Sequence, residues 1–270
     1  LSRKSFAQTH NRPAEILQKL IRFNTTNPPG NEAACISYIR DLLNDAGIPS
    51  TIIARKPERP NLIAHIEGRG KANPILLYGH VDVVGTENQQ WDFPPFDGTL
   101  VDGVVWGRGA LDMKGGIVTF LYAIKALNAA GYNTRPLKVV LAGDEEVAHA
   151  NSNAAEVFMQ EAKGAAAAFN CETGFVDDAI VTGRKGTAVF TLEVKGVAVH
   201  AGNEPENGRS AILEISHKVI DIQNLTNWEQ GTTFNVGVIE GGIVPNAVPG
   251  YAKIVVDIRY QDPALLPEIE

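Results

Sequence analysis

The pattern of hydrophobic and polar positions divides this chain into two parts that differ in the spacing of their apolar residues. In the first part, stretches with helical spacing of apolar residues alternate with short apolar runs that are typical of strands. The predicted helices span residues 14–23, 32–46, 116–130 and 154–162, and the predicted strands span residues 51–54, 62–66, 75–84, 137–142 and 165–169. Strands and helices in alternation predict an α/β domain with a mostly parallel sheet.

The second part begins after about residue 184, where the spacing changes. Three stretches alternate apolar and polar residues as half-buried strands do, and one stretch has helical spacing. The predicted strands span residues 187–195, 232–239 and 252–260, and the predicted helix spans residues 209–222. The pattern therefore predicts a first domain over residues 1–184 and a smaller α+β domain over residues 185–270.

Composition and charge exclude several classes of protein. The net charge of −7 over 270 residues disfavours nucleic-acid binding, which needs clustered Lys and Arg. The longest apolar run, residues 117–127, is interrupted by Lys125 and is too short to span a membrane. Two cysteines, Cys35 and Cys171, offer no disulfide framework and suit a reducing compartment. We therefore expect a cytoplasmic protein without nucleic-acid or membrane partners.

Polar side chains follow three of the predicted strands of the first domain, where functional groups collect in α/β sheets. His80 and Asp82 end one strand, Glu145 and Glu146 follow the next, and Glu172 follows the third. Side chains two apart on a strand point the same way, so Asp82 can accept the second ring N–H of His80 and orient it toward a metal. One histidine with several carboxylates suits zinc or a related divalent ion.

Each of these features also has a purely structural interpretation. A histidine and an aspartate two apart can form a hydrogen bond at a strand end, and a pair of glutamates can occupy a solvated turn or a helix N-terminus. A further acid, Asp112, lies in a loop just before a predicted helix and can be a simple N-cap. The metal-site interpretation is favoured because all of these acids fall near strand ends together.

Five stretches of the first domain together resemble the M20 metallopeptidases, a family that includes glutamate carboxypeptidase, aminoacylase, succinyl-diaminopimelate desuccinylase and acetylornithine deacetylase. They are GHVDVV at 79–84, WDFPPFDG at 91–98, WGRGALDMKGG at 106–116, the acidic pair at 145–146 and CETG at 171–174. The resemblance covers essentially the whole chain. It implies a zinc-peptidase-like catalytic domain with an inserted lid or dimerisation domain.

The resemblance also implies a metal site with two divalent ions, usually zinc, with cobalt or manganese as substitutes. Asp112 would bridge the two ions, His80 and Glu172 would complete one site, and Glu146 would serve the other. A cis peptide bond after the bridging aspartate is usual in the family. Asp82 would support His80 from behind, and Glu145 would be the general base that activates water.

The second domain matches the family at two stretches. GVAVHAGNEPENGRSA at 196–211 resembles the histidine motif of the lid, and by this resemblance His200 would reach across a homodimer to stabilise the oxyanion in the partner's site. GGIVPNAVPGYAKIVVDIRY at 241–260 resembles the substrate-carboxylate stretch, where Asn246 and Arg259 would hold the free carboxylate. Without the family resemblance, His200 would be interpreted as a histidine in a turn and Arg259 as a charged residue at the edge of a strand.

The chain departs from the family pattern where it ends. In the family the catalytic domain resumes after the lid and supplies a final histidine ligand, whereas this sequence stops at Glu270. We therefore expect an amino-terminal portion of a longer protein, with both domains incomplete. We expect this form alone to be inactive or nearly so and to bind its second metal weakly.

The predicted function is a di-metal hydrolase that cleaves an amide bond next to an amino acid with a free carboxylate, as a carboxypeptidase or dipeptidase does. An N-acyl amino acid deacylase, such as a deacetylase or desuccinylase, is a second hypothesis on the same scaffold. Two hypotheses without catalysis are a binding protein that keeps the fold and a purely structural dimerisation protein. The remaining histidines match no motif and read as structural: His10, His65, His149 and His217.

Overall fold

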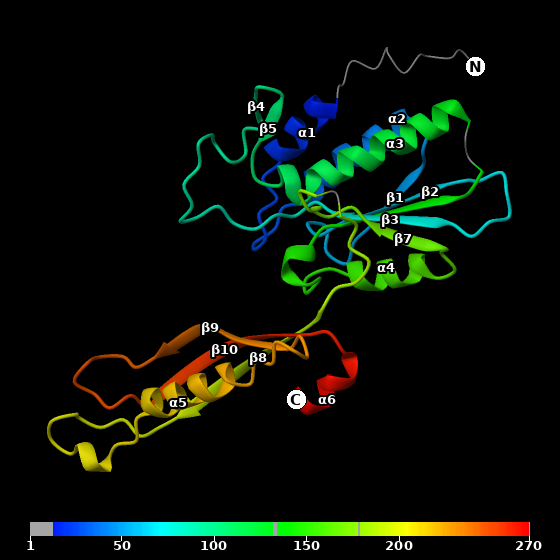
Figure 1. Ribbon diagram of the computed structural model, residues 1–270. Helices are drawn as coiled ribbons and strands as arrows, with labels where there is room; N and C mark the ends of the chain where they lie inside the picture. The colour runs from blue at the N-terminus through cyan, green and yellow to red at the C-terminus, as the bar shows by residue number, and fades with distance from the viewer. Residues whose placement is uncertain (1–12, 132–133, 178, 270) are drawn as a thin grey trace. The chain divides into compact units, whose positions relative to one another are not determined.

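The computed structural model of the chain describes residues 13–131, 134–177 and 179–269, so His10 lies outside the described residues. The chain divides into two compact units, Leu1–Val176 and Asp177–Glu270, which are coloured blue to green and yellow to red in Figure 1. The sequence pattern placed this boundary between residues 184 and 185, a short distance further along the chain.

The described part of the first unit is built on a five-stranded sheet in the order β1-β2-β6-β3-β7 (Figure 1). The strands β6, β3 and β7 are parallel, whereas β2 runs antiparallel to both β6 and β1. The predicted α/β class is therefore confirmed, whereas the sheet is mixed, with two parallel and two antiparallel pairings, because β2 runs against both of its neighbours. The bounds are β1 Ser50–Ile53, β2 Asn61–Ile66, β3 Ile75–His80, β6 Leu137–Ala142 and β7 Ala167–Asn170.

Helices cover both faces of this sheet (Figure 1). On one face, α1 (Pro13–Arg22), α2 (Ala33–Asp45) and α3 (Gly116–Ala130) bury their apolar sides against alternate strand residues such as Leu62 and Leu141. On the other face, α4 (Ala154–Ala162) packs on the intervening strand residues. Because both faces are buried, the central strands read as nearly continuous apolar runs.

Strand β3 ends at His80, four residues before the end of the predicted strand. Beyond that point Val83 forms a parallel bridge with Thr26, and its N–H donates to the carbonyl of Thr25. The chain therefore leaves the sheet to pair with the loop after α1. The prediction that His80 and Asp82 both lie on one strand is wrong for this reason.

A long polar segment connects β3 to α3. It contains a hairpin of β4 (Thr99–Val101) and β5 (Val104–Trp106) and then an irregular turn, Ala110–Gly115. The predicted cis peptide bond after Asp112 is present in that turn. The side chain of Lys114 is fully buried, and its Nζ donates to the carbonyls of Leu20 and Phe23 at the C-terminus of α1. A cation suits this end of a helix dipole.

The second unit is a three-stranded antiparallel sheet in the order β8-β10-β9, with α5 on one face. Alternate residues of β10, such as Ile254 and Val256, are buried against Ala211 and Ile215 of α5. The predicted α+β character is confirmed. The bounds are β8 Gly186–Lys195, α5 Ala211–Gln223, β9 Thr233–Gly241, β10 Tyr251–Tyr260 and α6 Leu266–Ile269.

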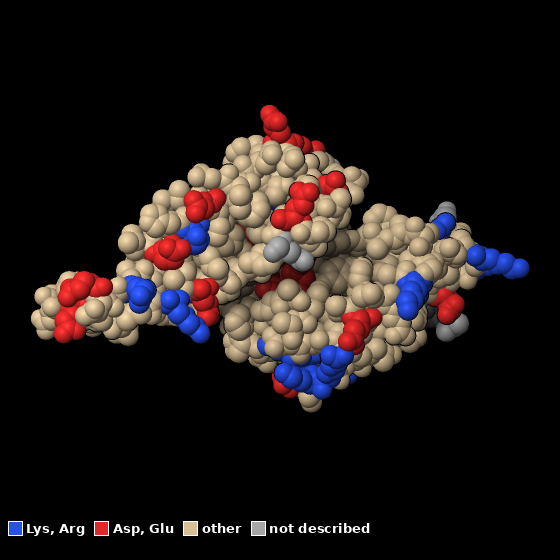
Figure 2. Space-filling model, turned by 90° about the horizontal axis from the view of Figure 1, so that it is seen from below, with Lys and Arg blue, Asp and Glu red and all other residues tan. Residues whose placement is uncertain are grey.

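Two surface properties bear on partners. Among the described residues, no helix combines the length and the apolar character that a bilayer span requires. On the face shown in Figure 2, Lys and Arg side chains lie among Asp and Glu side chains. The absence of nucleic-acid and membrane partners stays a prediction.

Candidate metal centre

The candidate site lies at the carboxyl ends of the three parallel strands. His80 is the last residue of β3, Glu145 begins the short helix η3 (Glu145–Val147) just after β6, and Glu172 follows β7. Asp112 joins them from the irregular turn that precedes α3. The polar clusters that the sequence pattern singled out therefore come from neighbouring strands of one sheet edge, as the rule for α/β sheets predicts.

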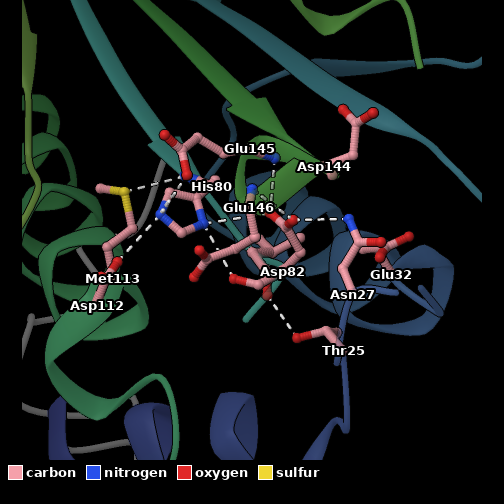
Figure 3. Close-up of polar contacts among 12 residues, drawn as sticks. Thr25, Asn27, Glu32, His80, Asp82, Asp112, Met113, Asp144, Glu145 and Glu146 are labelled. Atoms are coloured by element: carbon pink, nitrogen blue, oxygen red, sulfur yellow. Dashed lines mark hydrogen bonds and ion pairs between the residues drawn. The ribbon is translucent and has the colours of Figure 1, made fainter. Parts of the chain in front are cut away.

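The ring nitrogen Nε2 of His80 lies at the centre of a group of carboxylates (Figure 3). It is 3.2 Å from Oδ1 of Asp112, 3.2 Å from Oε1 of Glu172 and 3.8 Å from Oε2 of Glu145. One ligand atom from each of His80, Asp112 and Glu172 lies within 4.8 Å of the others. One imidazole and two carboxylates at this spacing are a donor set that zinc accepts.

Asp82 fixes the orientation of the His80 ring. Nδ1 of His80 lies 3.0 Å from the backbone carbonyl of Asp82 and 3.3 Å from its carboxylate oxygen Oδ1. A proton on Nδ1 that is donated to these oxygens leaves the lone pair of Nε2 free for a metal. The sequence predicted the carboxylate as the partner, whereas the structure brings the carbonyl of the same residue closer.

The carboxylate of Asp82 also fixes the backbone of the acidic pair. It is fully buried and accepts the N–H of Glu145 at Oδ1 and the N–H of Glu146 at Oδ2, each at 3.0 Å. Asn27 donates its side-chain N–H to the same Oδ2 at 2.9 Å. One buried carboxylate therefore sets the positions of His80 and of both glutamates.

The charges of the site are those of a cation-binding centre. Burial alone would lower the pKa of His80, but its hydrogen bonds with Asp112, Asp82 and Glu172 outweigh burial and raise this pKa to about 12. The hydrogen bond from His80 lowers the pKa of Asp112. A buried imidazole that is held so strongly in its charged form shows an excess of negative charge that a divalent ion would balance.

The two adjacent glutamates differ from the other acids in the site. Burial is the main cause that raises the pKa of Glu145, and it raises the pKa of Glu146 to about 7, with added repulsion from Asp112 and Asp82. Glu146 does not belong to the three-residue ligand group found among the described residues. Its role as the ligand of a second ion stays a prediction.

Sequence reasoning missed three buried polar residues behind the site. Asn27, Glu32 and Arg59 are almost fully buried and connect to Asp82 through hydrogen bonds. Asn27 and Glu32 come from the loop TTNPPGNE at 25–32, and Arg59 comes from a loop before β2. The polar and proline-rich character of the first loop is the signal that could have drawn attention to it.

The residues predicted to act from the lid all lie in the second unit. His200 and Ala247 form an antiparallel bridge, and the carbonyl of Asn246 accepts the N–H of Ala201, so His200 and Asn246 lie on adjoining segments. Nδ1 of His200 accepts the N–H of Gly202 at 3.1 Å. These contacts are those of a turn histidine, and they leave Nε2 for another partner.

Arg259 lies on β10 and forms a bidentate ion pair within its own strand. Its Nε and Nη2 donate to the two carboxylate oxygens of Asp257 at 2.7 and 2.9 Å, and this pair raises the pKa of Arg259. Two residues apart on a strand, the two side chains share one face of the sheet. A substrate carboxylate would have to compete with Asp257 for this guanidinium.

The fold and the site together are those of an α/β protein with a candidate metal centre at the carboxyl ends of its parallel strands. Residues 76–263 match the family described as "Peptidase family M20/M25/M40". The chain belongs to this family, and it is an enzyme of the metallopeptidase or amidohydrolase type that the M20 motifs predicted.

Comparison with individual proteins supports this assignment. The chain is 30% identical over 262 residues to a succinyl-diaminopimelate desuccinylase of Dechloromonas aromatica, a match that covers 91% of this chain and 67% of the relative. An M20 family metallo-carboxypeptidase of Sulfolobus solfataricus has the same fold, with a TM-score of 0.78 at 19% identity over 96% of this chain and 74% of that one. A dinuclear metal-binding peptidase of Bacillus subtilis gives a TM-score of 0.65 at 16% identity, covering 96% of this chain and 66% of that one.

Proposed function

We propose that this protein hydrolyses an amide bond next to an amino acid that carries a free carboxylate, with two divalent metal ions, most simply zinc, as cofactors. The observation that carries this proposal is the convergence of His80, Asp112 and Glu172 around one point. These residues come from separate segments of the chain and meet at the sheet edge where α/β enzymes bind their substrates.

The residues present fit such cofactors. His80 and Glu172 would hold one ion, Glu146 would hold the other, and Asp112, whose side chain is 57% exposed, would bridge them. Ions bound there would polarise the substrate carbonyl and make water more acidic. Cobalt or manganese would suit the same mixed nitrogen and oxygen donors.

Glu145 is the proposed general base. Its backbone is fixed by Asp82, its carboxylate lies 3.8 Å from Nε2 of His80, and its side chain is 39% exposed. Burial raises the pKa of Glu145, which brings the carboxyl closer to the pKa that a group needs in order to take and return a proton near neutral pH. Glu145 would take a proton from the attacking water and pass it to the leaving amine.

The second unit would supply substrate contacts. His200 would donate from Nε2 to the developing oxyanion of the partner chain's site in a homodimer, since its Nδ1 is engaged by a backbone N–H. Asn246 and Arg259 would bind the free carboxylate of the substrate. The carboxylate of the substrate would then replace the carboxylate of Asp257 as the bidentate partner of the Arg259 guanidinium.

Two substrate classes fit this chemistry. Small peptides are favoured by the stretch GRKG at 183–186 and by the region of His200, both of which look most similar to glutamate carboxypeptidase. N-acyl amino acids are favoured by the 30% identity to a protein named as a desuccinylase. The ligand set does not distinguish the two classes, because both reactions break the same kind of bond.

Metal analysis of the full-length natural protein, followed by a hydrolysis screen over dipeptides, longer peptides and N-acetyl and N-succinyl amino acids, tests the proposal. We expect two zinc ions per chain and turnover that a chelator abolishes and zinc restores. Turnover of N-acyl amino acids alone would assign the deacylase, and turnover of peptides alone would assign the peptidase. A protein that binds no metal, or that hydrolyses neither class with metal bound, would contradict the proposal.

A further inference from the structure

A buried polar chain leads away from the candidate metal centre toward the loop before β2. Asn27 donates from Nδ2 to Oδ2 of Asp82 at 2.9 Å. Arg59 donates from Nη1 to Oδ1 of Asn27 at 3.0 Å and to Oε1 of Glu32 at 3.2 Å, and from Nη2 to the carbonyl of Pro29. In Figure 3, Asn27 and Glu32 lie to the right of Asp82, on the side away from His80.

Burying this row of hydrogen-bonded polar side chains costs free energy. The relative exposure of Asn27 is 3%, that of Arg59 is 6%, and those of Glu32 and Asp82 are both 0%. Removing a charged group from water costs several kcal/mol per ion even when it is paired, so such groups are weak contributors to stability. A function in orienting neighbouring groups is the better account of why they are there.

Arg59 determines which way the amide of Asn27 faces. A guanidinium can only donate hydrogen bonds, so the carbonyl oxygen Oδ1 of Asn27 must face Arg59 and the NH₂ group must face Asp82. The carboxylate of Asp82 thereby receives a donor on the side away from the metal centre. Its remaining contacts are with the backbone N–H groups of Glu145 and Glu146 and with the ring of His80.

The loop itself is shaped around the guanidinium. Gly30 has a φ of +87°, and a Cβ atom placed on it would overlap the guanidinium of Arg59. A glycine at this position therefore allows the backbone to approach Arg59 closely. This close approach goes together with the hydrogen bond from Arg59 to the carbonyl of Pro29 and indicates that the loop and Arg59 fit each other.

We propose that Asn27 and Arg59 are positioning residues for the metal centre: through the carboxylate of Asp82 they fix the ring of His80 and the backbone of the two glutamates. This inference rests on the proposed function of the site. It assigns to the loop at 25–32 and to Arg59 a role in setting metal affinity and the base's position, without any contact with metal or substrate.

The test is the Asn27→Asp variant of the full-length protein. It is nearly isosteric and keeps an acceptor for Arg59, but it replaces the donor toward Asp82 with a second carboxylate oxygen. We expect zinc affinity, measured by competition with a chelator, to fall by about 10–100-fold, the range found when partners of metal ligands are removed. We also expect a lower kcat with little change in KM and altered visible absorption bands after substitution with Co²⁺.

Asn61→Asp is the matched control. Asn61 is also fully buried in the first unit, donates to Asn153 at 3.1 Å and accepts the N–H of Gly143 at 3.2 Å, but it does not contact Asp82. This variant should lose stability while keeping the Co²⁺ spectrum and a zinc affinity close to those of the wild type. A general cost of burying a carboxylate would affect both variants equally.

Arg59→Lys provides a second arm if Asn27→Asp fails to fold. Lysine keeps the charge opposite Glu32 but lacks the planar fork that contacts three partners, so we expect a smaller, several-fold loss of zinc affinity. Wild-type zinc affinity and Co²⁺ spectrum in both variants would overturn the positioning role and leave the proposed function standing. A wild-type protein that binds no metal would overturn both.

Discussion

Glu145 is the side chain on which the proposed chemistry depends most directly. It lies beside the ligand group but outside it, and its backbone N–H is fixed by Asp82. A group in this position can transfer protons without binding the metal. Its substitution should therefore separate catalysis from metal binding.

We predict that Glu145→Gln lowers kcat by about 10²–10⁴-fold, the usual contribution of a general base, and leaves the metal content unchanged. Steady-state kinetics and elemental analysis of the same preparation measure the two quantities. Glu156→Gln is the control, because Glu156 is an exposed glutamate whose ion pair with Arg55 lies on the surface. Retained turnover in Glu145→Gln, or loss of metal together with turnover, would contradict the assignment.

Glu32 provides a prediction about pH. Burial is the main cause that raises its pKa from 4.5 to about 7, with the charge of Arg59 opposing, and its Oε2 has no hydrogen-bond partner in the described part of the structure. Between these two pH values the unfolded chain loses the proton while the folded protein keeps it. The free energy of unfolding should therefore fall as pH rises through this window.

Glu32→Gln mimics the protonated form. We predict that its free energy of unfolding rises relative to that of the wild type, by about 3 kcal/mol at most, as pH rises from 5 to 8. Urea unfolding of both proteins at several pH values, with equal metal content, measures this difference. A wild type that gains stability relative to the variant as pH rises would show that the ionised pair with Arg59 is favourable instead.

At the scale of elements, the ligands depend on how closely α3 approaches the end of β7. A Cβ atom added to Gly116, the first residue of α3, would collide with the carbonyl oxygen of Cys171. Cys171 directly precedes the proposed ligand Glu172. The absence of a side chain at Gly116 therefore lets the helix and the strand end meet where Glu172 must be placed.

We predict that Gly116→Ala displaces the segment of Glu172 and lowers zinc affinity by 10-fold or more, on the order of the effect of removing a ligand's support. Gly174→Ala is the matched control in the same segment, because a Cβ there meets no atom within 4 Å. Chelator competition on both variants gives the comparison. Equal zinc affinity in the two variants would show that the segment adapts to the added methyl group.

At the scale of the whole molecule, the proposed dimer can be tested by complementation between two inactive variants. If His200 acts in the partner's site, a mixed dimer of His200→Ala and Glu145→Gln chains contains one intact site, formed by Glu145 of the first chain and His200 of the second. Each variant alone has none. We predict that co-refolding equal amounts of the two inactive variants restores about a quarter of wild-type activity, since half of the dimers are mixed and each has one site.

The preparation must be shown to contain mixed dimers. If its activity then stays at the level of the separate variants, His200 acts in the site of its own chain or takes no part in the reaction. Mixing Glu145→Gln with His217→Ala is the control. His217 is a lid histidine that matches no motif, so this mixture should show only the activity of the His217→Ala chains.

Local patterns predicted most of the elements because they report on local conformation and burial. The bounds of α3, β6 and α4 agree with the residue ranges that apolar spacing indicated. The end of β3 was predicted wrongly, because Val81 and Val83 are fully buried and read as strand, although Val83 pairs with the loop after α1 rather than with the sheet. Apolar spacing shows that a residue is buried but not which segment covers it.

The sequence by itself determined which side chains are available for metal chemistry, since His80 and the acids at 112, 145, 146 and 172 stand in motifs specific enough to indicate the family. The tertiary structure decided which atoms meet. The contact of Asn27 with Asp82 spans 55 positions and that of Arg59 with Asn27 spans 32. The first exists because the segment after β3 pairs with the loop at 25–32 through the bridge between Thr26 and Val83. No local pattern encodes such pairs, because their geometry depends on strands and loops that are distant in the chain becoming neighbours only after folding.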